Sequence, residues 1–127
     1  MRPLKLAYSK IIPFSGWYAI TIFNYLIRRE EYKNTPIETI TYNHESIHQA
    51  QAYDFGIGFC GYFIFYILYF LEWLFKAILS IFTGFKVKAY YSISFEQECF
   101  KHQTDLQYLD NRKPFSWVKY IFKLVKK

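Results

Sequence analysis

The stretch from residue 55 to residue 85 constrains the fold more than any other part of the chain. No charged residue occurs between positions 55 and 71, and only Glu72 and Lys76 interrupt the apolar sequence that follows. A helix that is apolar on every side needs a surround other than water, and roughly 20 apolar residues are enough to span a membrane. We therefore expect segment 55–85 to form a long helix or helical hairpin associated with a membrane. The alternative is a core helix wrapped by the rest of a small domain.

Aromatic residues and positive charge agree with a position at a membrane. The 127 residues include 14 Phe, 13 Tyr and 3 Trp, more than the core of one small domain needs. Tyr and Trp combine an apolar body with a polar tip and so suit the boundary between water and lipid. The net charge of +6 suits an anionic membrane surface. It would also suit nucleic acid, but no recognisable nucleic-acid-binding motif accompanies it, so no nucleic-acid partner is expected.

The C-terminal segment, 114–127, is predicted to be a basic amphipathic helix. A helix would separate its apolar side chains from its lysines: Phe115, Val118, Ile121, Phe122 and Val125 on one face, Lys119, Lys123, Lys126 and Lys127 elsewhere. This pattern is typical of helices at membrane interfaces, and a docking helix with a solvated lysine face has the same pattern. Because lysine-rich segments favour the cytoplasmic side, we expect a protein on the cytoplasmic side of a bacterial inner membrane, or otherwise a cytoplasmic one.

The length of 127 residues suits a single domain, 1–127. Aromatic and β-branched residues from Trp17 to Ile27 predict a strand. Tyr42–Tyr53 is predicted to be a helix. Thr35, Pro36 and Glu38 form a capping pattern at which this helix could start, although the β-branched residues that follow favour a start nearer Tyr42.

A second polar and apolar helix is predicted to begin at Ser94. Ser94 would be its N-cap and Gln97 the reciprocal capping partner, and the helix should end at about Leu109. With one strand region and several helices, the expected fold class is α+β and mostly helical. The strand region would pack on the Tyr42–Tyr53 helix.

His44, Glu45 and His48 form an HEXXH pattern within the first predicted helix. Residues four apart lie on one face of a helix, so both imidazoles can bind one tetrahedral Zn²⁺ at about 2.0–2.1 Å. Glu45 would stand beside the metal, where it can take a proton from a water whose pKa zinc lowers towards ~7. The pattern therefore predicts a zinc site with His44 and His48 as ligands and Glu45 as the catalytic base. The alternative is a helix with ordinary surface or core histidines.

A catalytic zinc site of this kind needs a third protein ligand and one open position. Asp54 stands where the metzincin pattern would place a third histidine. The third ligand is therefore expected to be a carboxylate from later in the chain. Glu96 and Glu98 in the second predicted helix and Glu72 in the apolar segment are the candidates. Glu72 can instead form an i, i+4 ion pair with Lys76.

Two motifs resemble those of gluzincin-type zinc proteases. HESIHQAQ, which starts at His44, resembles their HEXXHXXQ helix, and EQEC at 96–99 resembles the EXXA or EXXC element that contains their third ligand. The pair is similar to HtpX and the CAAX prenyl endopeptidases, which are membrane-embedded, and to BlaR-type sensor proteases. Residues 42–100 also resemble a group of short bacterial proteins with HEXIHXXQ, an EWL or EYL step and AYRXIXFEXEA. Here these read HESIHQAQ, LEWL and AYYSISFEQEC.

The resemblance implies that Glu96 is the third zinc ligand. Phe100 stands where an Asp usually follows the EXXC element, so a hydrogen-bond partner for one ligand histidine must come from elsewhere. Gln51 either orients a ligand or is an ordinary polar residue near the end of its helix. Tyr90 and Tyr91 are candidate hydrogen-bond donors to a developing oxyanion.

These observations predict a zinc-dependent metallopeptidase that hydrolyses peptide bonds in a peptide or protein substrate. The alternative is a non-enzymatic membrane-associated or interaction protein with a structural or vestigial zinc site. An open coordination position would favour the enzyme, and a fourth protein ligand would favour the structural site. The sequence predicts no oligomeric state.

Overall fold

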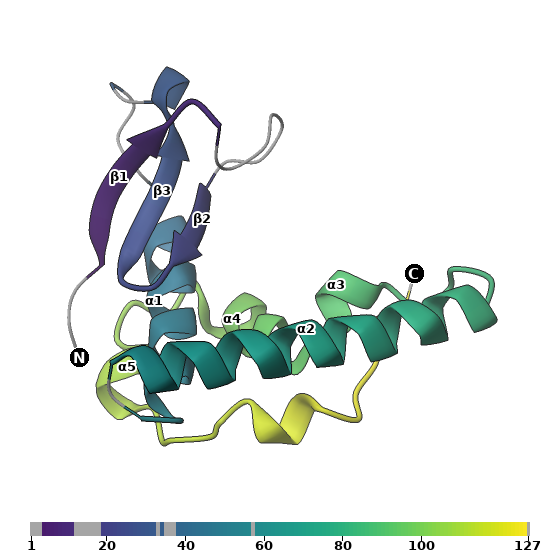
Figure 1. The fold of residues 1–127 in the computed structure, drawn as a ribbon. Helices are drawn as coiled ribbons and strands as arrows, with labels where there is room; N and C mark the ends of the chain where they lie inside the picture. Colours follow the sequence, from purple (N-terminus) through teal and green to yellow (C-terminus); the bar gives the residue numbers. More distant parts are fainter. Residues whose placement is uncertain (1–3, 12–18, 33, 35–37, 57, 127) are drawn as a thin grey trace.

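The computed structural model describes residues 4–11, 19–32, 34, 38–56 and 58–126. Within these ranges the chain is mostly helical with one small sheet, so the predicted α+β class is confirmed. Figure 1 shows the sheet above one end of the helical part, the helix α1 (Thr39–Tyr53) below it, and the long helix α2 (Phe59–Phe82) along the base.

The sheet has the strand order β1-β3-β2, with β1 at Lys5–Ser9, β2 at Ala19–Ile22 and β3 at Tyr25–Arg29. The central strand β3 pairs in parallel with β1 and antiparallel with β2. Leu26 in the middle of β3 is completely buried. The sequence pattern indicated no strand at β1, because its residues are mixed in character.

The prediction of one strand from Trp17 to Ile27 is wrong for the described part of that segment. The chain turns back at Phe23 and Asn24, and Phe23 has a φ of 54°, so β2 and β3 form a hairpin. This φ is uncommon for a bulky residue and persists only where the surroundings hold it. Here the Phe23 N–H donates to the Tyr66 hydroxyl over 2.7 Å, and its ring packs on Tyr62. Residues 17 and 18 lie outside the described residues.

The helix α1 confirms the prediction for Tyr42–Tyr53 and begins three residues earlier, at Thr39. The Glu38 side chain makes no cap hydrogen bond, and Thr35 and Pro36 lie outside the described residues. At its other end α1 meets the start of α2 very closely. A Cβ atom on Gly61 would collide with the carbonyl oxygen of Gly56 and lie 2.8 Å from that of Ala52, so only glycine permits this approach.

The apolar segment forms one straight run of helix, α2, and not a helical hairpin. It is long and apolar enough to cross a membrane, with a mean hydropathy of 1.8 over its most apolar window. Only 17% of that window is buried within the protein, so the alternative of a wrapped core helix is wrong. The predicted i, i+4 ion pair is present, with 2.8 Å between Lys76 Nζ and Glu72 Oε2.

The predicted helix from Ser94 to Leu109 is shorter and differently capped. After the short α3 (Ala89–Ser92), the helix α4 runs from Ser94 to His102, and a separate turn of helix, α5, covers Tyr108–Asn111. Ser94 is not an N-cap, because its backbone N–H and its hydroxyl both donate to the Glu72 carboxylate, over 2.7 and 2.6 Å. A carboxylate from α2 thus takes the place of the expected capping box.

The predicted C-terminal amphipathic helix is wrong for the described residues. Residues 114–126 form turns, a short 3₁₀ helix η2 (Val118–Tyr120) and a β-bridge between Val87 and Lys126. Trp117 and Tyr120 are buried, and Trp117 belongs to the main core with Phe65 and Phe95. Docking of these large rings and backbone bonds to other elements outweighs the weak helix preference of so short a segment.

Candidate metal centre

Three buried side chains from two helices converge beside α2. His44 and His48 lie one turn apart on α1, and Glu96 comes from the first turn of α4. One carboxylate oxygen of Glu96 lies 3.1 Å from His44 Nε2, and the other lies 2.9 Å from His48 Nε2. The side chains are only 9%, 10% and 3% exposed, respectively. The structure therefore brings together the three residues that the sequence analysis named as zinc ligands.

The far nitrogen of each imidazole faces an amide oxygen. His44 Nδ1 lies 2.7 Å from Gln103 Oε1, and His48 Nδ1 lies 2.8 Å from Gln51 Oε1. The orientation of the Gln51 amide is fixed, because its nitrogen donates to the Phe95 carbonyl over 2.8 Å and to Glu98 over 3.0 Å. An amide oxygen only accepts, so each Nδ1 is assigned the proton.

This proton assignment makes the centre a site for positive charge. A neutral imidazole protonated on Nδ1 presents the lone pair of Nε2 to the Glu96 carboxylate, and two acceptors at this distance repel each other. Either further protons or a cation must lie between them. Two imidazole nitrogens and one carboxylate are also the ligand set of one class of catalytic zinc sites, so the donors fit Zn²⁺.

The pKa values reflect the same close packing of charge. Burial lowers the pKa of His48, but the adjacent Cys99 and Glu96 raise it, and the net shift is upward. Burial raises the pKa of Glu96, but the charge of His48 and the hydrogen bonds from both histidines bring it well below its usual range. Glu96 is therefore ionised at neutral pH, as a metal ligand must be.

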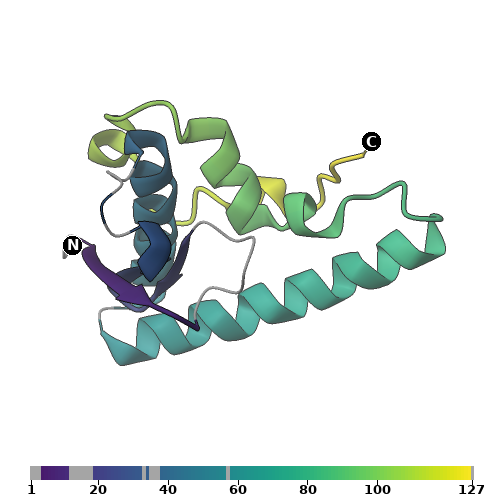
Figure 2. The same ribbon diagram turned by 90° about the horizontal axis from the view of Figure 1, so that it is seen from above.

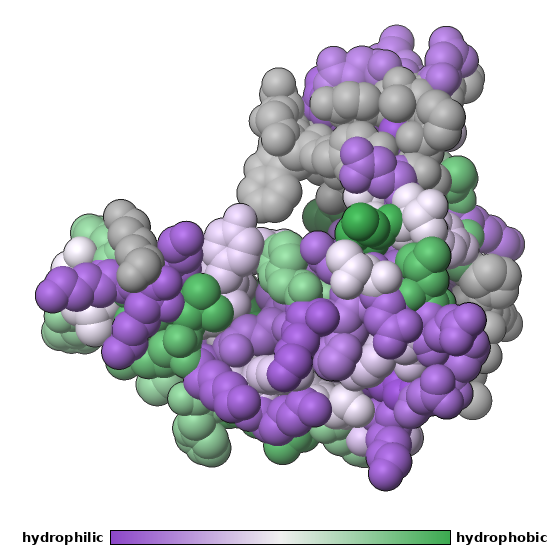
Figure 3. Space-filling view, turned by 180° about the vertical axis from the view of Figure 1, so that it is seen from behind, coloured by the Kyte–Doolittle hydropathy of each residue, from purple (hydrophilic) through white to green (hydrophobic). Residues whose placement is uncertain are grey.

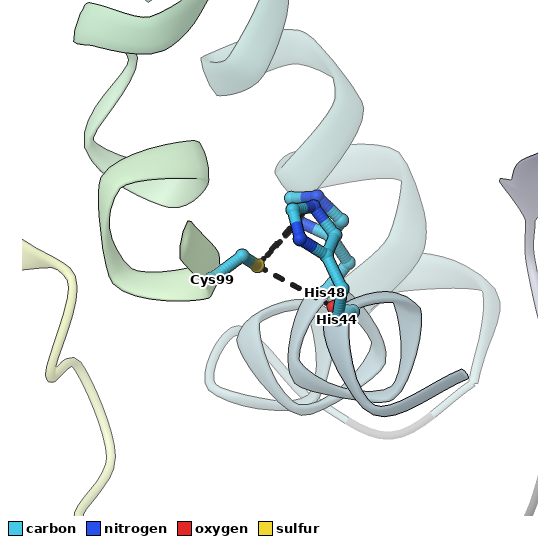
Figure 4. Close-up of side chains that lie close together, drawn as sticks. All are labelled: His44, His48 and Cys99. Carbon is cyan, nitrogen blue, oxygen red and sulfur yellow. Dashed lines mark hydrogen bonds between the residues drawn. The ribbon is translucent and has the colours of Figure 1, made fainter. Parts of the chain in front are cut away.

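Cys99, one turn beyond Glu96 on α4, lies against the two histidines (Figure 4). Ligand atoms of His44, His48 and Cys99 all lie within 4.8 Å of one another, so this buried group can hold a metal ion. Cys99 Sγ is 3.5 Å from Nδ1 and 3.6 Å from Nε2 of His48. A sulfur atom nearly equidistant from both nitrogens lies over the face of the ring, because in the ring plane it would collide with the carbon between them.

Cys99 and Glu96 approach His48 from different directions: Cys99 lies over the face of the ring, and Glu96 faces the Nε2 atom. The Nε2 atoms of both histidines face the Glu96 carboxylate, so Glu96 would hold an ion together with them where the side chains now stand, and Cys99 would have to move to do so. Burial also raises the pKa of the Cys99 thiol to about 12, so without a metal ion this side chain is a neutral thiol at neutral pH.

Glu45 lies on α1 between the two histidines and is partly exposed. Its Oε2 accepts a hydrogen bond of 2.7 Å from the hydroxyl of Thr21 in β2. The other carboxylate oxygen remains for proton transfer. Thr21 thus orients the predicted base, and the sequence analysis missed it, because no local pattern relates a strand residue to the helix that follows.

Two tyrosines surround Glu96. The Tyr69 hydroxyl, from α2, donates to Glu96 Oε2 over 2.6 Å. Tyr90 is partly buried. Its pKa is raised by burial, by the charge of Glu96 and by a hydrogen bond to the Glu96 carboxylate. Tyr91, the other candidate oxyanion donor, is 46% exposed and packs against Phe100 with its ring tilted by 42°. Of the pair, only Tyr90 lies at the centre.

The other two candidate ligands lie elsewhere. Glu72 holds the start of α4 and Lys76, as described above. Glu98 points to the opposite side of α4, where Arg112 donates to it from Nε over 2.5 Å and the Tyr108 hydroxyl over 2.6 Å. Arg112 also makes a two-bond ion pair with Asp54, over 3.0 and 2.8 Å.

Gln103 supplies the hydrogen-bond partner of a histidine that was expected to come from elsewhere, because Phe100 stands at the position of the usual aspartate. Phe100 packs its ring on His44, with 4.8 Å between centroids, and offers no hydrogen bond. Gln103 follows the end of α4 and supplies the acceptor for His44 Nδ1. No signal in the sequence indicated Gln103, because the chain bends after His102 and the position is set by that bend.

Comparison of the chain with models of known protein families, with well-characterised proteins and with solved structures finds no match. The functional assignment therefore depends on the donor set and its geometry, and the resemblance to gluzincin families stays a prediction.

Proposed function

We propose that the protein is a zinc-dependent metallopeptidase in which His44, His48 and Glu96 hold the ion and Glu45 is the general base. The observation that supports it most is the Glu96 carboxylate, which bridges the two Nε2 atoms at 3.1 and 2.9 Å with both Nδ1 atoms engaged by amides. A bound Zn²⁺ would polarise the scissile carbonyl and make a water acidic at neutral pH.

The protein's own residues then move the proton. Glu45 stands next to ligand His44 with one oxygen held by Thr21, so its other oxygen can accept the proton of the attacking water and pass it to the leaving amine. Gln51 and Gln103 keep Nδ1 of each histidine protonated and so keep Nε2 as the donor atom for the ion.

The position of β2 favours an extended peptide as the substrate. Among the described residues β2 pairs only with β3, so its other edge can accept a further strand. Thr21 of this edge strand touches Glu45, and a peptide added there would pass close to the proposed base. An edge strand binds a peptide through backbone hydrogen bonds, which do not depend on the peptide's side chains. This mode of binding suits a peptidase.

The test measures zinc and cleavage on the same samples. Wild type should contain about one zinc per chain, because the ligands form a single set. Cleavage is measured by mass spectrometry on a mixture of unstructured peptides. The His44→Ala variant should lose both its bound zinc and its cleavage activity. Glu45→Gln should keep zinc and lose cleavage, because Glu45 is a base and not a ligand. Equal zinc in wild type and His44→Ala, or full cleavage by Glu45→Gln, would exclude the proposal.

A structural zinc site is the competing function, and the position of Cys99 is the observation that favours it. A fourth protein ligand would close the coordination sphere and leave no place for water. Cobalt substitution decides between the two, because a thiolate ligand adds an intense charge-transfer absorption to the Co²⁺ spectrum. The enzyme requires a spectrum without that band and a Cys99→Ser variant with unchanged metal affinity. A band that Cys99→Ser abolishes would favour the structural site.

Membrane association through α2 is also part of the proposed function. The length, hydropathy and low burial of α2 support it, and the lysine-rich C-terminal segment favours the cytoplasmic side of a bacterial inner membrane. Fractionation of expressing cells tests it. Recovery of a soluble monomer without detergent would exclude this part of the proposal and leave the metal centre unaffected.

A further inference from the structure

We propose that α2 lies parallel to the plane of an anionic membrane surface, with its exposed face in the lipid and the metal centre on its water-facing side. The inference rests on the proposed membrane association and adds the orientation of the helix and the class of lipid. It does not depend on the metal centre, because the face of α2 concerned contains no proposed ligand.

The α2 helix differs from a water-exposed helix, because its polar side chains are buried beside the core residues Tyr62 and Phe65 while large apolar ones face outwards. Its buried side includes Lys76, at 2% exposed, Ser80, at 8%, and the capping carboxylate of Glu72. Its exposed side consists of large apolar residues: Phe59, Phe63, Ile64, Ile67, Phe70, Leu71, Trp73, Leu74, Phe75, Ile78, Ile81 and Phe82. This continuous face extends along the whole helix and is far larger than the patches that soluble monomers expose.

Charge complementarity identifies the surface as anionic. No Asp or Glu occurs in residues 73–95 or 111–127. In Figure 1 the end of α2, α3 and the C-terminus lie together on one side of the molecule. Lys86 and Lys88 are exposed there, and Lys126 joins them through its bridge to Val87. A cluster of lysines beside an apolar helix face is the combination that anionic lipids attract.

The elements that pack beside α2 argue against a spanning orientation. Figure 2 shows α4, α3 and the C-terminal segment alongside α2 over much of its length. A helix that crossed the bilayer would take this layer into the hydrocarbon, together with the exposed Lys101 and Lys119. Charged side chains at that depth are costly unless they face a polar interior. A helix parallel to the surface leaves them all in water.

The rest of the molecule also faces away from the apolar side of α2. The sheet meets α2 at the β2–β3 turn, where Phe23 packs on Tyr62, and its other end rises away from α2 to the exposed Glu30 and Glu31 (Figure 1). The face opposite to that of Figure 1 is largely hydrophilic over the helical part, and hydrophobic groups show there at the projecting end of α2 and beneath the sheet (Figure 3). The membrane-facing side is therefore confined to α2 and its immediate neighbours.

The first test is flotation of the purified full chain with lipid vesicles. We expect about tenfold or tighter binding to phosphatidylcholine with phosphatidylglycerol than to phosphatidylcholine alone. Lys86→Glu/Lys88→Glu should remove most of this preference. Lys5→Glu/Lys10→Glu, with the same charge change at the start of β1 and just beyond its end, should keep it. Phe70→Asp should weaken binding roughly tenfold. Leu106→Asp should not, although Leu106 is equally exposed, at 57% against 56%.

The second test measures depth along α2 with spin labels on the native, exposed Cys60 and, in Cys60→Ser chains, on Leu71→Cys or Phe82→Cys. These positions are eleven residues apart and share one helix face. A parallel helix gives equal depths at all three. A deep label at position 71 with shallow labels at both ends would overturn the orientation and leave membrane association standing. Equal binding to both vesicle types would overturn the lipid class. No vesicle binding, or a stable dimer instead, would overturn membrane association itself.

Discussion

Gln51 and His48, neighbours on one face of α1, are joined by a 2.8 Å hydrogen bond whose direction is fixed by a third element. The Gln51 amide nitrogen already donates to the Phe95 carbonyl and to Glu98, so its oxygen must face the imidazole. Gln51 is completely buried. The sequence alone allowed Gln51 to be either a residue that orients a ligand or an ordinary polar residue, and its hydrogen bond to His48 places it beside a proposed ligand.

Gln51→Met should therefore lower zinc affinity about 10- to 100-fold, the usual effect of removing a partner that orients a ligand histidine. The side chain keeps its volume, but His48 loses the acceptor that holds Nδ1 protonated. Competition with a chromogenic chelator measures the change.

Gln49→Met is the matched control for that measurement. Gln49 is another buried glutamine on α1, and its amide donates to the Tyr62 hydroxyl over 3.3 Å and to no ligand. The zinc affinity of the Gln49→Met variant should stay close to that of the wild type. Equal affinities for the two variants would mean that Gln51 acts only in packing.

Substitution of the two carboxylates of α4 should have different effects, one on zinc binding and the other on folding stability. Glu96→Ala should lose zinc as completely as His48→Ala, because a site of two ligands no longer closes around the ion. Glu98→Ala should still bind zinc, because the Phe95 carbonyl still holds the Gln51 amide in place. It should unfold more easily by about 3–5 kcal/mol, because Arg112 then has a buried charge with one partner fewer. Elemental analysis and denaturant unfolding are the measurements. Zinc loss from Glu98→Ala with retention by Glu96→Ala would reverse the assignment.

Gly61→Ala should destabilise the junction of α1 and α2 by about 1–3 kcal/mol or prevent folding, because the added methyl group collides with two backbone carbonyls. Ile64→Ala, on the exposed side of the same helix, is the comparison variant, because it also introduces alanine into α2 but brings no collision with a backbone carbonyl. That variant should change the free energy of unfolding by less than about 0.5 kcal/mol. Similar free energies of unfolding for the two variants would show that α1 and α2 can move apart without loss of stability.

Local periodicity explains what the sequence could predict. His44 and His48 are four residues apart, and any α-helix places them on one face, so their meeting needed only the helix prediction. The same is true of the pair Glu72 and Lys76. Glu96 was chosen among three carboxylates by resemblance alone, because the distance between α1 and α4 is set by packing. The long apolar run predicted α2 directly, since few other structures accommodate it.

The missed features depend on contacts between distant segments. Phe23 and Asn24 are no usual turn pair, and the hairpin there relies on the hydroxyl of Tyr66, forty-three residues away. Gln103 reaches His44 only because α4 ends early, and Thr21 reaches Glu45 only because β2 lies over α1. None of these follows from propensity or spacing, since tertiary contacts override both.

The final prediction concerns the polar link between α2 and the helix that contains Glu96. Glu72 accepts three hydrogen bonds, from Lys76 and from the N–H and hydroxyl of Ser94. Glu72→Ala leaves an almost completely buried ammonium with only the Ser92 carbonyl and leaves two Ser94 donors without an acceptor. The free energy of unfolding should fall by about 3–5 kcal/mol. Lys76→Met in the same chain should recover part of this loss, because it removes the unpaired charge. Denaturant unfolding of both single variants and the double variant gives the coupling energy, and purely additive effects would show that the pair is not coupled.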